Sequence, residues 1–64
     1  MIKIKDFIDL LIQSGVLQDC VFYQKQDLMK IPVDIDTAYQ SVGNLIDLDL
    51  CCVEESPYIE VVYE

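Results

Sequence analysis

Residues 45–64 read LIDLDLCCVEESPYIEVVYE, and this stretch decides the fold. It contains two runs in which apolar and polar residues alternate, joined by Glu54-Glu55-Ser56-Pro57. Alternation over this length is typical of half-buried strands, and a Ser-Pro pair between two such runs is a turn signal. The stretch therefore predicts a C-terminal β-hairpin.

The two faces of the predicted hairpin differ in chemistry. Because side chains alternate along a strand, the first strand divides its residues between two faces. Ile46, Leu48, Leu50 and Cys52 share one face, whereas Asp47, Asp49 and Cys51 share the other. On the second strand Ile59, Val61 and Tyr63 face the core, whereas Tyr58, Glu60, Val62 and Glu64 face outward. The pattern predicts one apolar face and one face rich in carboxylates.

The N-terminal segment predicts an amphipathic helix from Ile4 to Ser14. Its apolar residues recur at helical spacing and form one stripe: Ile4, Phe7, Ile8, Leu11 and Ile12. Asp6 and Asp9 lie in the early turns, where the helix dipole favours negative charge. Gly15 follows Ser14 and supplies the left-handed residue that ends a helix.

Two further strands are predicted after this helix. Residues 20–24 read CVFYQ, a short run rich in β-branched and aromatic residues that is typical of a strand. Residues 25–27 predict a turn. Residues 28–31 predict a second, weaker strand that Pro32 either ends or places at a sheet edge.

The segment from Pro32 to Asn44 is open to two interpretations. Residues 33–36 read VDID and alternate like a strand, whereas residues 36–43 resemble one or two helical turns. In the second interpretation Asp36 is the N-cap and Gly43 the stop signal. We favour a loop with a short helical turn over residues 37–42.

Together these elements predict an α+β fold with a single domain spanning residues 1–64. One N-terminal helix packs on a three- to four-stranded, mainly antiparallel sheet that ends in the C-terminal hairpin. A chain of 64 residues has a small core, and no disulfide framework or metal-site pattern is present to support it. Self-association as a homodimer and a partner-bound form are therefore both open.

The charge balance restricts the class of partner. The net charge is −8, from twelve carboxylates and four lysines. Affinity for phosphates comes from Lys and Arg, so nucleic acids and anionic membranes are disfavoured as partners. A basic protein surface is the partner that such a field attracts, although the charge also simply favours solubility.

The cysteines and the N-terminus point to the cytoplasm. Three cysteines are present, Cys20, Cys51 and Cys52, and we expect reduced thiols because no secretion signal accompanies them. Cys51 and Cys52 are neighbours on opposite faces of a strand and are poorly placed to bridge. Cys20 and Cys52 are most simply small core residues.

No pattern in the sequence indicates catalysis, a metal or a cofactor. Histidine is absent, as are a nucleophile elbow, a glycine-rich phosphate loop and a C-x-x-C motif. The pairs Asp34/Asp36 and Asp47/Asp49 supply oxygen ligands of the kind Ca²⁺ prefers, but residues i and i+2 of a strand project in parallel rather than converging. A solvated sheet face is the favoured interpretation, and we expect no enzyme activity.

The same parallel projection supports a binding hypothesis. Carboxylates held at regular spacing on a sheet imitate a run of phosphates and could occupy a basic nucleic-acid channel, as a DNA mimic does. Rigid charges lose less entropy on docking, and tyrosine is a favoured anchor at interfaces. The candidate partner-binding residues are Asp34, Asp36, Tyr39, Asp47, Asp49, Glu54, Glu55, Tyr58, Glu60 and Glu64.

The chain also resembles a small family of phage and prophage proteins. The resemblance lies in the opening IKIKDFIDLLI, in Gln18-Asp19 before the VFY strand, and in an acidic terminal hairpin that ends in VVYE. The chain departs from the family in the middle, where PVDIDTAYQSVGN replaces a tight turn. The resemblance implies a mobile-element origin and a non-enzymatic role. By size and charge the chain is similar in kind to phage inhibitors of bacterial defence, including anti-CRISPR proteins, which implies a host nuclease complex as the target.

Two other functions remain open. An oligomer could hold a small nucleotide between protomers, with Tyr39, Gln40, Ser41 and Asn44 as uncharged hydrogen-bonding groups. Against this, the lysines at positions 3, 5, 25 and 30 are scattered along the sequence. The chain could also be a structural accessory protein with no inhibitory target.

Overall fold

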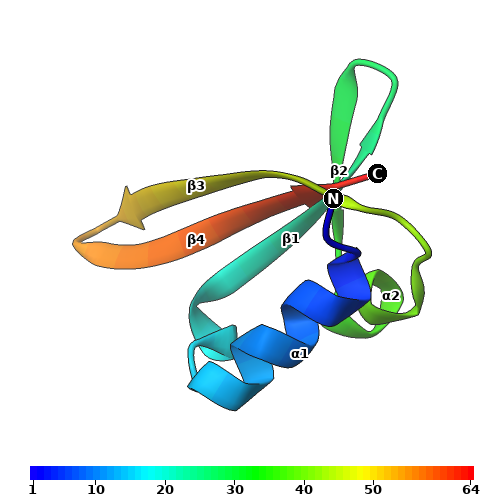
Figure 1. Cartoon of the computed structure of the whole chain (residues 1–64). Helices are drawn as coiled ribbons and strands as arrows, with labels where there is room; N and C mark the ends of the chain where they lie inside the picture. Colours follow the sequence, from blue (N-terminus) through cyan, green and yellow to red (C-terminus); the bar gives the residue numbers. More distant parts are fainter.

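The computed structural model describes residues 1–64 and confirms the α+β fold (Figure 1). The elements in chain order are α1 (Ile4–Ser14), a 3-10 turn η1 (Leu17–Asp19), β1 (Cys20–Gln26), β2 (Met29–Val33), α2 (Ile35–Gln40), β3 (Leu45–Val53) and β4 (Ser56–Tyr63). The long helix and the terminal hairpin lie at nearly their predicted positions. The second helix has six residues, as many as the turn predicted over residues 37–42, but it begins and ends two residues earlier.

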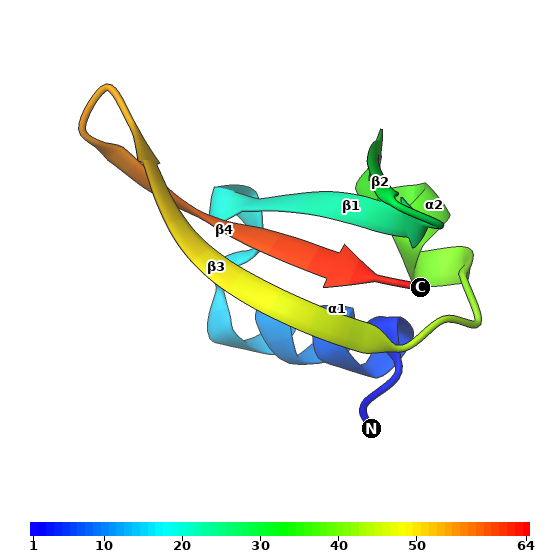
Figure 2. The ribbon, with the colours of Figure 1, turned by 90° about the horizontal axis from the view of Figure 1, so that it is seen from above.

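The four strands form one sheet in the order β2-β1-β4-β3 (Figure 2). The pairs β1–β2 and β3–β4 are antiparallel, and β1–β4 is parallel. Strand β4 lies between β1 and β3 and runs in the same direction as β1, which gives the one parallel pair. The sheet is thus mainly antiparallel, as predicted, with β2 and β3 at its edges.

Helix α1 is amphipathic as predicted, and its inward face carries Ile4, Ile8 and Leu11. Gly15 ends the helix at φ 78°, and its N–H group bonds to the carbonyls of Leu11 and Ile12. The prediction was wrong for Ile12, whose side chain is 55% exposed. Ile12 lies at the side of the apolar stripe, where no strand or helix covers it.

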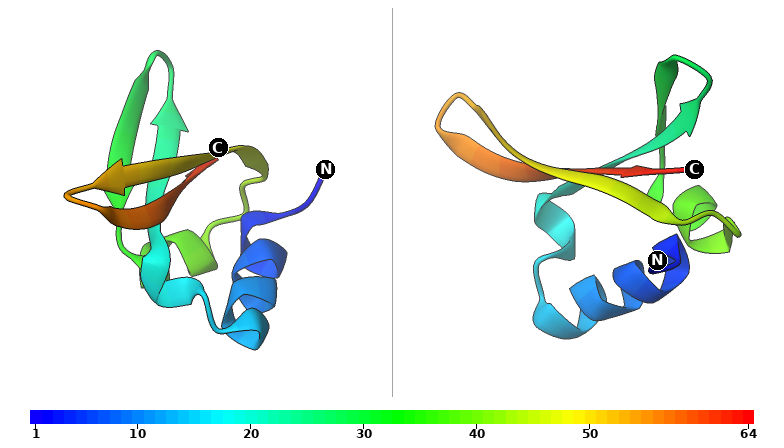
Figure 3. Two further views of the ribbon diagram at one scale, coloured as in Figure 1. Left: turned by 90° about the vertical axis from the view of Figure 1, so that its left-hand side faces the viewer. Right: turned by 45° about the horizontal axis from the view of Figure 1, so that its top comes forward.

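The core lies between one face of the sheet and the two helices, which are both on that side (Figures 1 and 3). Its buried members are Ile4, Ile8, Leu11, Phe22, Ala38, Val61 and Tyr63. The helices cover the end of the sheet near the chain termini, and the β3–β4 hairpin extends beyond them (Figure 3). Consequently Leu48 and Leu50 point to the helix side but remain 45% and 78% exposed.

The turn between β1 and β2 lies later than predicted. Lys25 and Gln26 still belong to β1, and the turn consists of Asp27 and Leu28. Asp27 has φ 55°, a left-handed conformation that aspartate tolerates better than most residues. Pro32 lies within β2 opposite Tyr23, at the sheet edge, which is one of the two positions predicted for it.

The segment before β3 corrects two assignments of the sequence analysis. The N-cap of α2 is Asp34 rather than Asp36, because the Asp34 carboxylate accepts a hydrogen bond of 3.1 Å from the Thr37 N–H. The helix ends at Ser41 in extended conformation, so Gly43 is not its stop signal. Glycine is needed at position 43 because a Cβ atom there would overlap the backbone carbonyl of Glu64.

The hairpin between β3 and β4 has a two-residue loop, Glu54-Glu55, with φ values of 51° and 68°. Positive φ at both loop positions is the type I′ pattern, which matches the natural twist of paired strands. The predicted four-residue connection was too long, because Ser56 and Pro57 already belong to β4. Glutamate occupies both loop positions, where glycine or asparagine is usual in this type of turn.

A register shift between Leu45 and Asp47 changes one predicted face assignment. Leu45 pairs with Tyr63 and Asp47 pairs with Val62, so Ile46 is an extra residue without a partner. Ile46 therefore lines the carboxylate face and not the apolar face. The alternation from Asp47 onward follows the prediction.

Candidate protein-binding surface

We use the term outer face for the side of the sheet that faces away from the helices. Paired residues share a face, so the register places Asp47 with Val62, Asp49 with Glu60, and Cys51 with Tyr58 on the outer face. The parallel pairing adds Val21 and Tyr23 of β1. The outer face thus extends from the hairpin onto the middle of the sheet.

The carboxylates of the outer face differ in their exposure and pairing. Asp47 and Asp49 are exposed and take part in no salt bridge. Glu60 is different, because its side chain is only 17% exposed and its Oε1 lies 3.4 Å from Lys30 Nζ. The face predicted to be rich in carboxylates therefore also carries a cation at its centre, where Lys30 of β2 reaches across β1.

The lysines and carboxylates line one shallow hollow of about 300 Å³ on this face. Its lining residues are Lys25, Lys30, Ile46, Asp47, Asp49, Glu60 and Val62. Lys30 also lies over the Tyr23 ring, 5.3 Å from its centre, a cation–π contact. Val62 was predicted to face outward and does, but only 8% of it is exposed. The centre of the outer face is thus mixed in charge and partly apolar.

The tip of the hairpin is purely acidic. Glu54 and Glu55 are exposed, and neither takes part in a salt bridge. The tip is at the end of the molecule furthest from α2 and the chain termini (Figures 1 and 2). Together with Asp47 and Asp49 it gives the ribbon four exposed carboxylates without a cation partner.

Tyr58 stands next to these carboxylates and is half buried. Its pKa is raised, first by removal of the phenol from water and then by interaction with the Cys51 thiol and the charge of Glu60. The phenol is therefore neutral at physiological pH and can donate a hydrogen bond. This is the polar and apolar combination that makes tyrosine useful at protein interfaces.

Comparisons of the chain with protein-family models, with curated proteins and with solved structures gave no match. The resemblance to phage proteins thus stays a prediction. None of the helices has the length and apolar character needed to cross a membrane. No group of three or more His, Cys, Asp or Glu side chains is placed to hold a metal ion.

The remaining predicted site residues lie away from the hairpin. Asp34, Asp36 and Tyr39 belong to α2 and its cap, on the helix side of the sheet. The Tyr39 hydroxyl donates a 2.9 Å hydrogen bond to Asp9 Oδ1, which is the main reason that its pKa is raised. Glu64 exchanges backbone hydrogen bonds with Asn44. The structure therefore does not join these four residues to the hairpin carboxylates in one surface.

Asp34 acts as a structural carboxylate. Its pKa is lowered, first by the hydrogen bonds from Thr37 that hold the charged form. This pattern is typical of a helix cap. The hydrogen bonds explain the perturbation without a ligand.

A small basic hollow that sequence reasoning missed lies beside α2. Lys3, Lys5, Tyr39, Gln40, Ser41 and Val42 line a space of about 340 Å³. Lys5 Nζ lies 5.5 Å from the centre of the Tyr39 ring. Two of the lysines that are far from Tyr39 in sequence are thus beside it in space. Asn44, which the nucleotide hypothesis included, instead pairs with Glu64 at the sheet edge.

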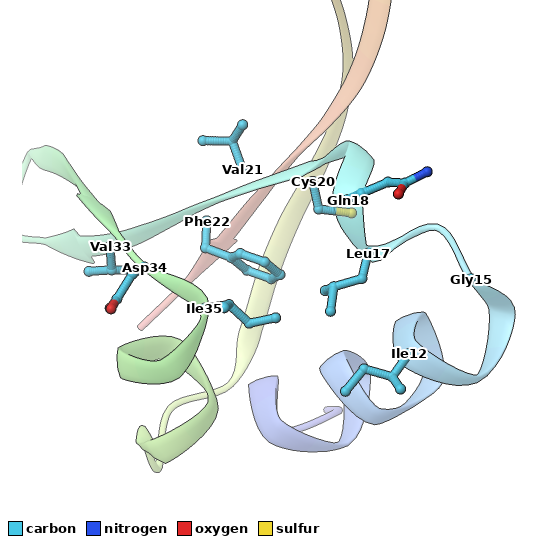
Figure 4. Close-up of a pocket in the computed structure, with 10 residues that line it drawn as sticks. All are labelled: Ile12, Gly15, Leu17, Gln18, Cys20, Val21, Phe22, Val33, Asp34 and Ile35. Carbon is cyan, nitrogen blue, oxygen red and sulfur yellow. The ribbon is translucent and has the colours of Figure 1, made fainter.

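The largest hollow, about 640 Å³, lies between the end of α1, β1 and the start of α2 (Figure 4). Its ten lining residues are Ile12, Gly15, Leu17, Gln18, Cys20, Val21, Phe22, Val33, Asp34 and Ile35. Most are apolar, and the hollow could not be predicted from the sequence because its walls come from five elements, α1, η1, β1, β2 and α2. The Cys20 pKa is raised by burial and then by the nearby charge of Asp19, so this thiol is not activated.

The cysteines are unpaired and differ in burial. Cys20 packs against the core, as predicted. Cys52 does not, and the prediction of a core residue was wrong there. Cys52 points to the helix side, but at its position the hairpin has already passed the end of the helices.

Proposed function

We propose that this chain is a non-enzymatic binding protein that occupies a basic surface on a host defence complex and inhibits it. The observation that carries the proposal is the exposed acidic ribbon of Asp47, Asp49, Glu54 and Glu55, none of which takes part in a salt bridge. A phage-type origin would place this activity in the cytoplasm of the host cell.

The spacing of these charges favours a basic partner over a metal ion. Asp47 and Asp49 are alternate residues of one strand, so their side chains project in parallel about 6.6 Å apart. A row of this kind matches a row of Lys or Arg side chains better than a single cation, which needs converging ligands. Strand pairing with β4 holds the row in place before binding, which lowers the entropy that docking costs.

The lysines on the same sheet narrow the binding surface to the hairpin. Glu60 is paired with Lys30, so it adds little net charge for a partner to recognise. The working set is therefore Asp47, Asp49 and the tip, with Tyr58 as the anchor residue. Lys25 and Lys30 repel the cations of a basic partner. The partner therefore contacts the hairpin tip rather than the centre of the outer face.

Charge reversal tests this surface. Asp47→Lys with Asp49→Lys should abolish capture of host proteins by the immobilised chain, while the circular dichroism spectrum stays unchanged. The matched control is Asp6→Lys with Asp19→Lys, which changes the net charge equally at exposed carboxylates outside the hairpin. Mass spectrometry identifies the host proteins that the wild type and the control retain and that the hairpin variant loses. If these proteins form a nuclease complex, a nuclease assay with added wild-type chain measures the inhibition.

Removing the charges of the ribbon one at a time distinguishes recognition of the Asp47–Asp49 row from a general effect of net charge. Asp47→Asn and Asp49→Asn remove charge at nearly constant shape, and each should weaken binding most at low salt. Equal capture by the hairpin variant and the wild type at low salt would refute the electrostatic account. Equal loss in the hairpin variant and in the matched control would show that only net charge matters.

A second candidate function rests on the basic hollow beside α2. Two lysines and the ring of Tyr39 meet there, which is the set of groups that a small anionic ligand with an aromatic base would need. Isothermal titration with cyclic nucleotides tests it, with Lys3→Ala and Lys5→Ala as the variants expected to lose the heat of binding. Heat that survives both substitutions would exclude this hollow as the site.

A further inference from the structure

The two edges of the sheet are protected to very different extents. The β2 edge is short, Met29–Val33, and carries both Lys30 and Pro32, residues that hinder pairing with another strand. The β3 edge is nine residues long and contains no lysine and no proline. Only its start is covered, where the Leu45 N–H bonds to the Ile2 carbonyl.

The hydrogen-bond pattern shows which backbone groups point out of the β3 edge. Asn44 and Glu64 exchange two backbone hydrogen bonds, of 2.9 and 3.1 Å. In an antiparallel pair the bonded positions alternate, so Val62, Glu60, Tyr58 and Ser56 are the next β4 residues that bond to β3. Pro57, which has no N–H, fits this pattern because it falls at a non-bonded position opposite Cys52.

Beyond the covered start of β3, three residues therefore direct their backbone groups away from β4: Leu48, Leu50 and Cys52. The Leu48 N–H supports this assignment, because it bonds to the carboxylate of its neighbour Asp47 at 2.9 Å rather than to β4. The side chains of the same three residues lie on the helix side and are exposed. The edge thus presents unpaired peptide groups and apolar side chains together.

We propose that a second copy of this chain pairs with the β3 edge in antiparallel orientation, with the two-fold axis at Leu50. In this register Leu50 pairs with Leu50 of the second copy, and Leu48 pairs with Cys52. All three outward-facing residues of each copy then find partners, which gives six backbone hydrogen bonds. The result is an eight-stranded sheet continuous through both copies.

The charges select this register among the alternatives. An axis at Asp49 would place the two Asp49 carboxylates directly opposite each other, which is destabilising. With the axis at Leu50, Asp49 lies opposite Cys51 and Asp47 opposite Val53. The ends are complementary as well, because the acidic tip Glu54-Glu55 of one copy lies beside the covered start of β3 in the other, next to Lys3.

This dimer leaves the outer face of each hairpin free. The inference goes beyond the proposed function, and neither depends on the other. The Leu48 N–H now donates a hydrogen bond to the Asp47 carboxylate. This bond must break before the same N–H can donate to the Cys52 carbonyl of the second copy. Asp47→Ala should therefore tighten association relative to the wild type.

Sedimentation velocity tests the proposal with a matched pair of variants. The wild type should sediment at twice the 7.4 kDa chain mass, and so should Leu28→Lys, whose residue is 99% exposed in the β1–β2 turn. Leu50→Lys adds the same charge at the axis and should sediment as a monomer with an unchanged circular dichroism spectrum. A monomeric wild type at millimolar concentration, or an equally dimeric Leu50→Lys, would overturn the proposal.

Cross-linking tests the register independently. Asp49→Cys places a thiol opposite Cys51 of the second copy at a non-bonded pair, where side chains are closest. In a chain with Cys20→Ser and Cys52→Ser, mild oxidation should join two copies through residues 49 and 51. Asp47→Cys in the same background lies opposite Val53 and should give no such product. Cross-linking of the Asp47→Cys chain but not the Asp49→Cys chain would refute an axis at Leu50.

Discussion

Gly43 offers the sharpest test of how the chain closes on itself. Its carbonyl accepts a hydrogen bond from the Ile4 N–H, and its Cα faces the backbone carbonyl of Glu64, the residue that follows β4. A Cβ atom at position 43 would overlap the Glu64 carbonyl oxygen and lie 2.5 Å from its carbonyl carbon. Gly43→Ala must therefore move backbone rather than a flexible side chain.

The magnitude follows from what must move. Separating the two backbones breaks the pair of hydrogen bonds between Asn44 and Glu64, each worth about 1 kcal/mol, and overpacking adds about 1–3 kcal/mol. We expect Gly43→Ala to lower the free energy of unfolding by about 3–5 kcal/mol. For 64 residues the whole stability is roughly 3–10 kcal/mol, so the loss is a large share of it.

Gly15→Ala is the matched control, because that glycine is present for a different reason. A Cβ at position 15 meets nothing within 4 Å, but the residue has φ 78°. The left-handed conformation costs alanine about 1–2 kcal/mol, partly offset by a less flexible unfolded chain. We therefore expect a smaller loss than at position 43, and one confined to the end of α1.

Urea unfolding measures the two losses, and amide hydrogen exchange locates them. In Gly43→Ala the amides of Asn44 and Glu64 should lose protection, whereas in Gly15→Ala they should keep it. A Gly43→Ala chain whose free energy of unfolding lies within about 0.5 kcal/mol of the wild-type value would refute the close contact between the two backbones.

Two further predictions concern the helices. Ile8→Ala, at a fully buried position, should cost about 2–5 kcal/mol in urea unfolding, whereas Leu10→Ala on the exposed side of the same helix should change stability by less than about 0.5 kcal/mol; equal losses would contradict the observed face of α1. The Asp34 pKa is lowered in the folded chain, so its charge stabilises the fold above the ordinary carboxyl pKa of 3.8 and ceases to do so as pH falls through the lowered value. Asp34→Asn should keep the cap but remove this pH dependence, and Asp34→Ala should lower the melting temperature at pH 7; thermal unfolding from pH 2 to 7 measures both, and an Asp34→Asn chain with the wild-type pH profile would contradict the role of the Thr37 hydrogen bond.

The parts of the fold that could be predicted depend on neighbours in sequence. The α1 stripe and the β3–β4 alternation are local patterns, and Gly15 is a local stop signal. Ile46 could not be assigned correctly, because the register shift at this residue depends on how Leu45 and Asp47 pair with β4. The parallel β1–β4 pair was also out of reach, since nothing in either strand encodes its partner.

The candidate site shows the same division. The acidic row was predictable because alternate residues of one strand share a face. The Lys30–Glu60 salt bridge was not, because it joins residues 30 positions apart. For the same reason Lys3 and Lys5 looked scattered in the sequence, although the fold places them beside Tyr39. The carboxylates counted along β3 and β4 therefore overstate the negative charge of the outer face, because Lys30 offsets that of Glu60.

The lengths of α1 and β3 alone predict that the hairpin extends past the helices. Helix α1 has 11 residues and spans about 16 Å at 1.5 Å per residue, whereas β3 has 9 residues and spans about 30 Å at 3.3 Å per residue. A helix of this length cannot cover a strand of that length, and α2, with 6 residues, adds little. The apolar side of the hairpin must therefore extend past the core, as the exposure of Leu50 shows. A strand that stays apolar beyond the reach of its own helices is better explained by a second molecule than by the fold of one chain.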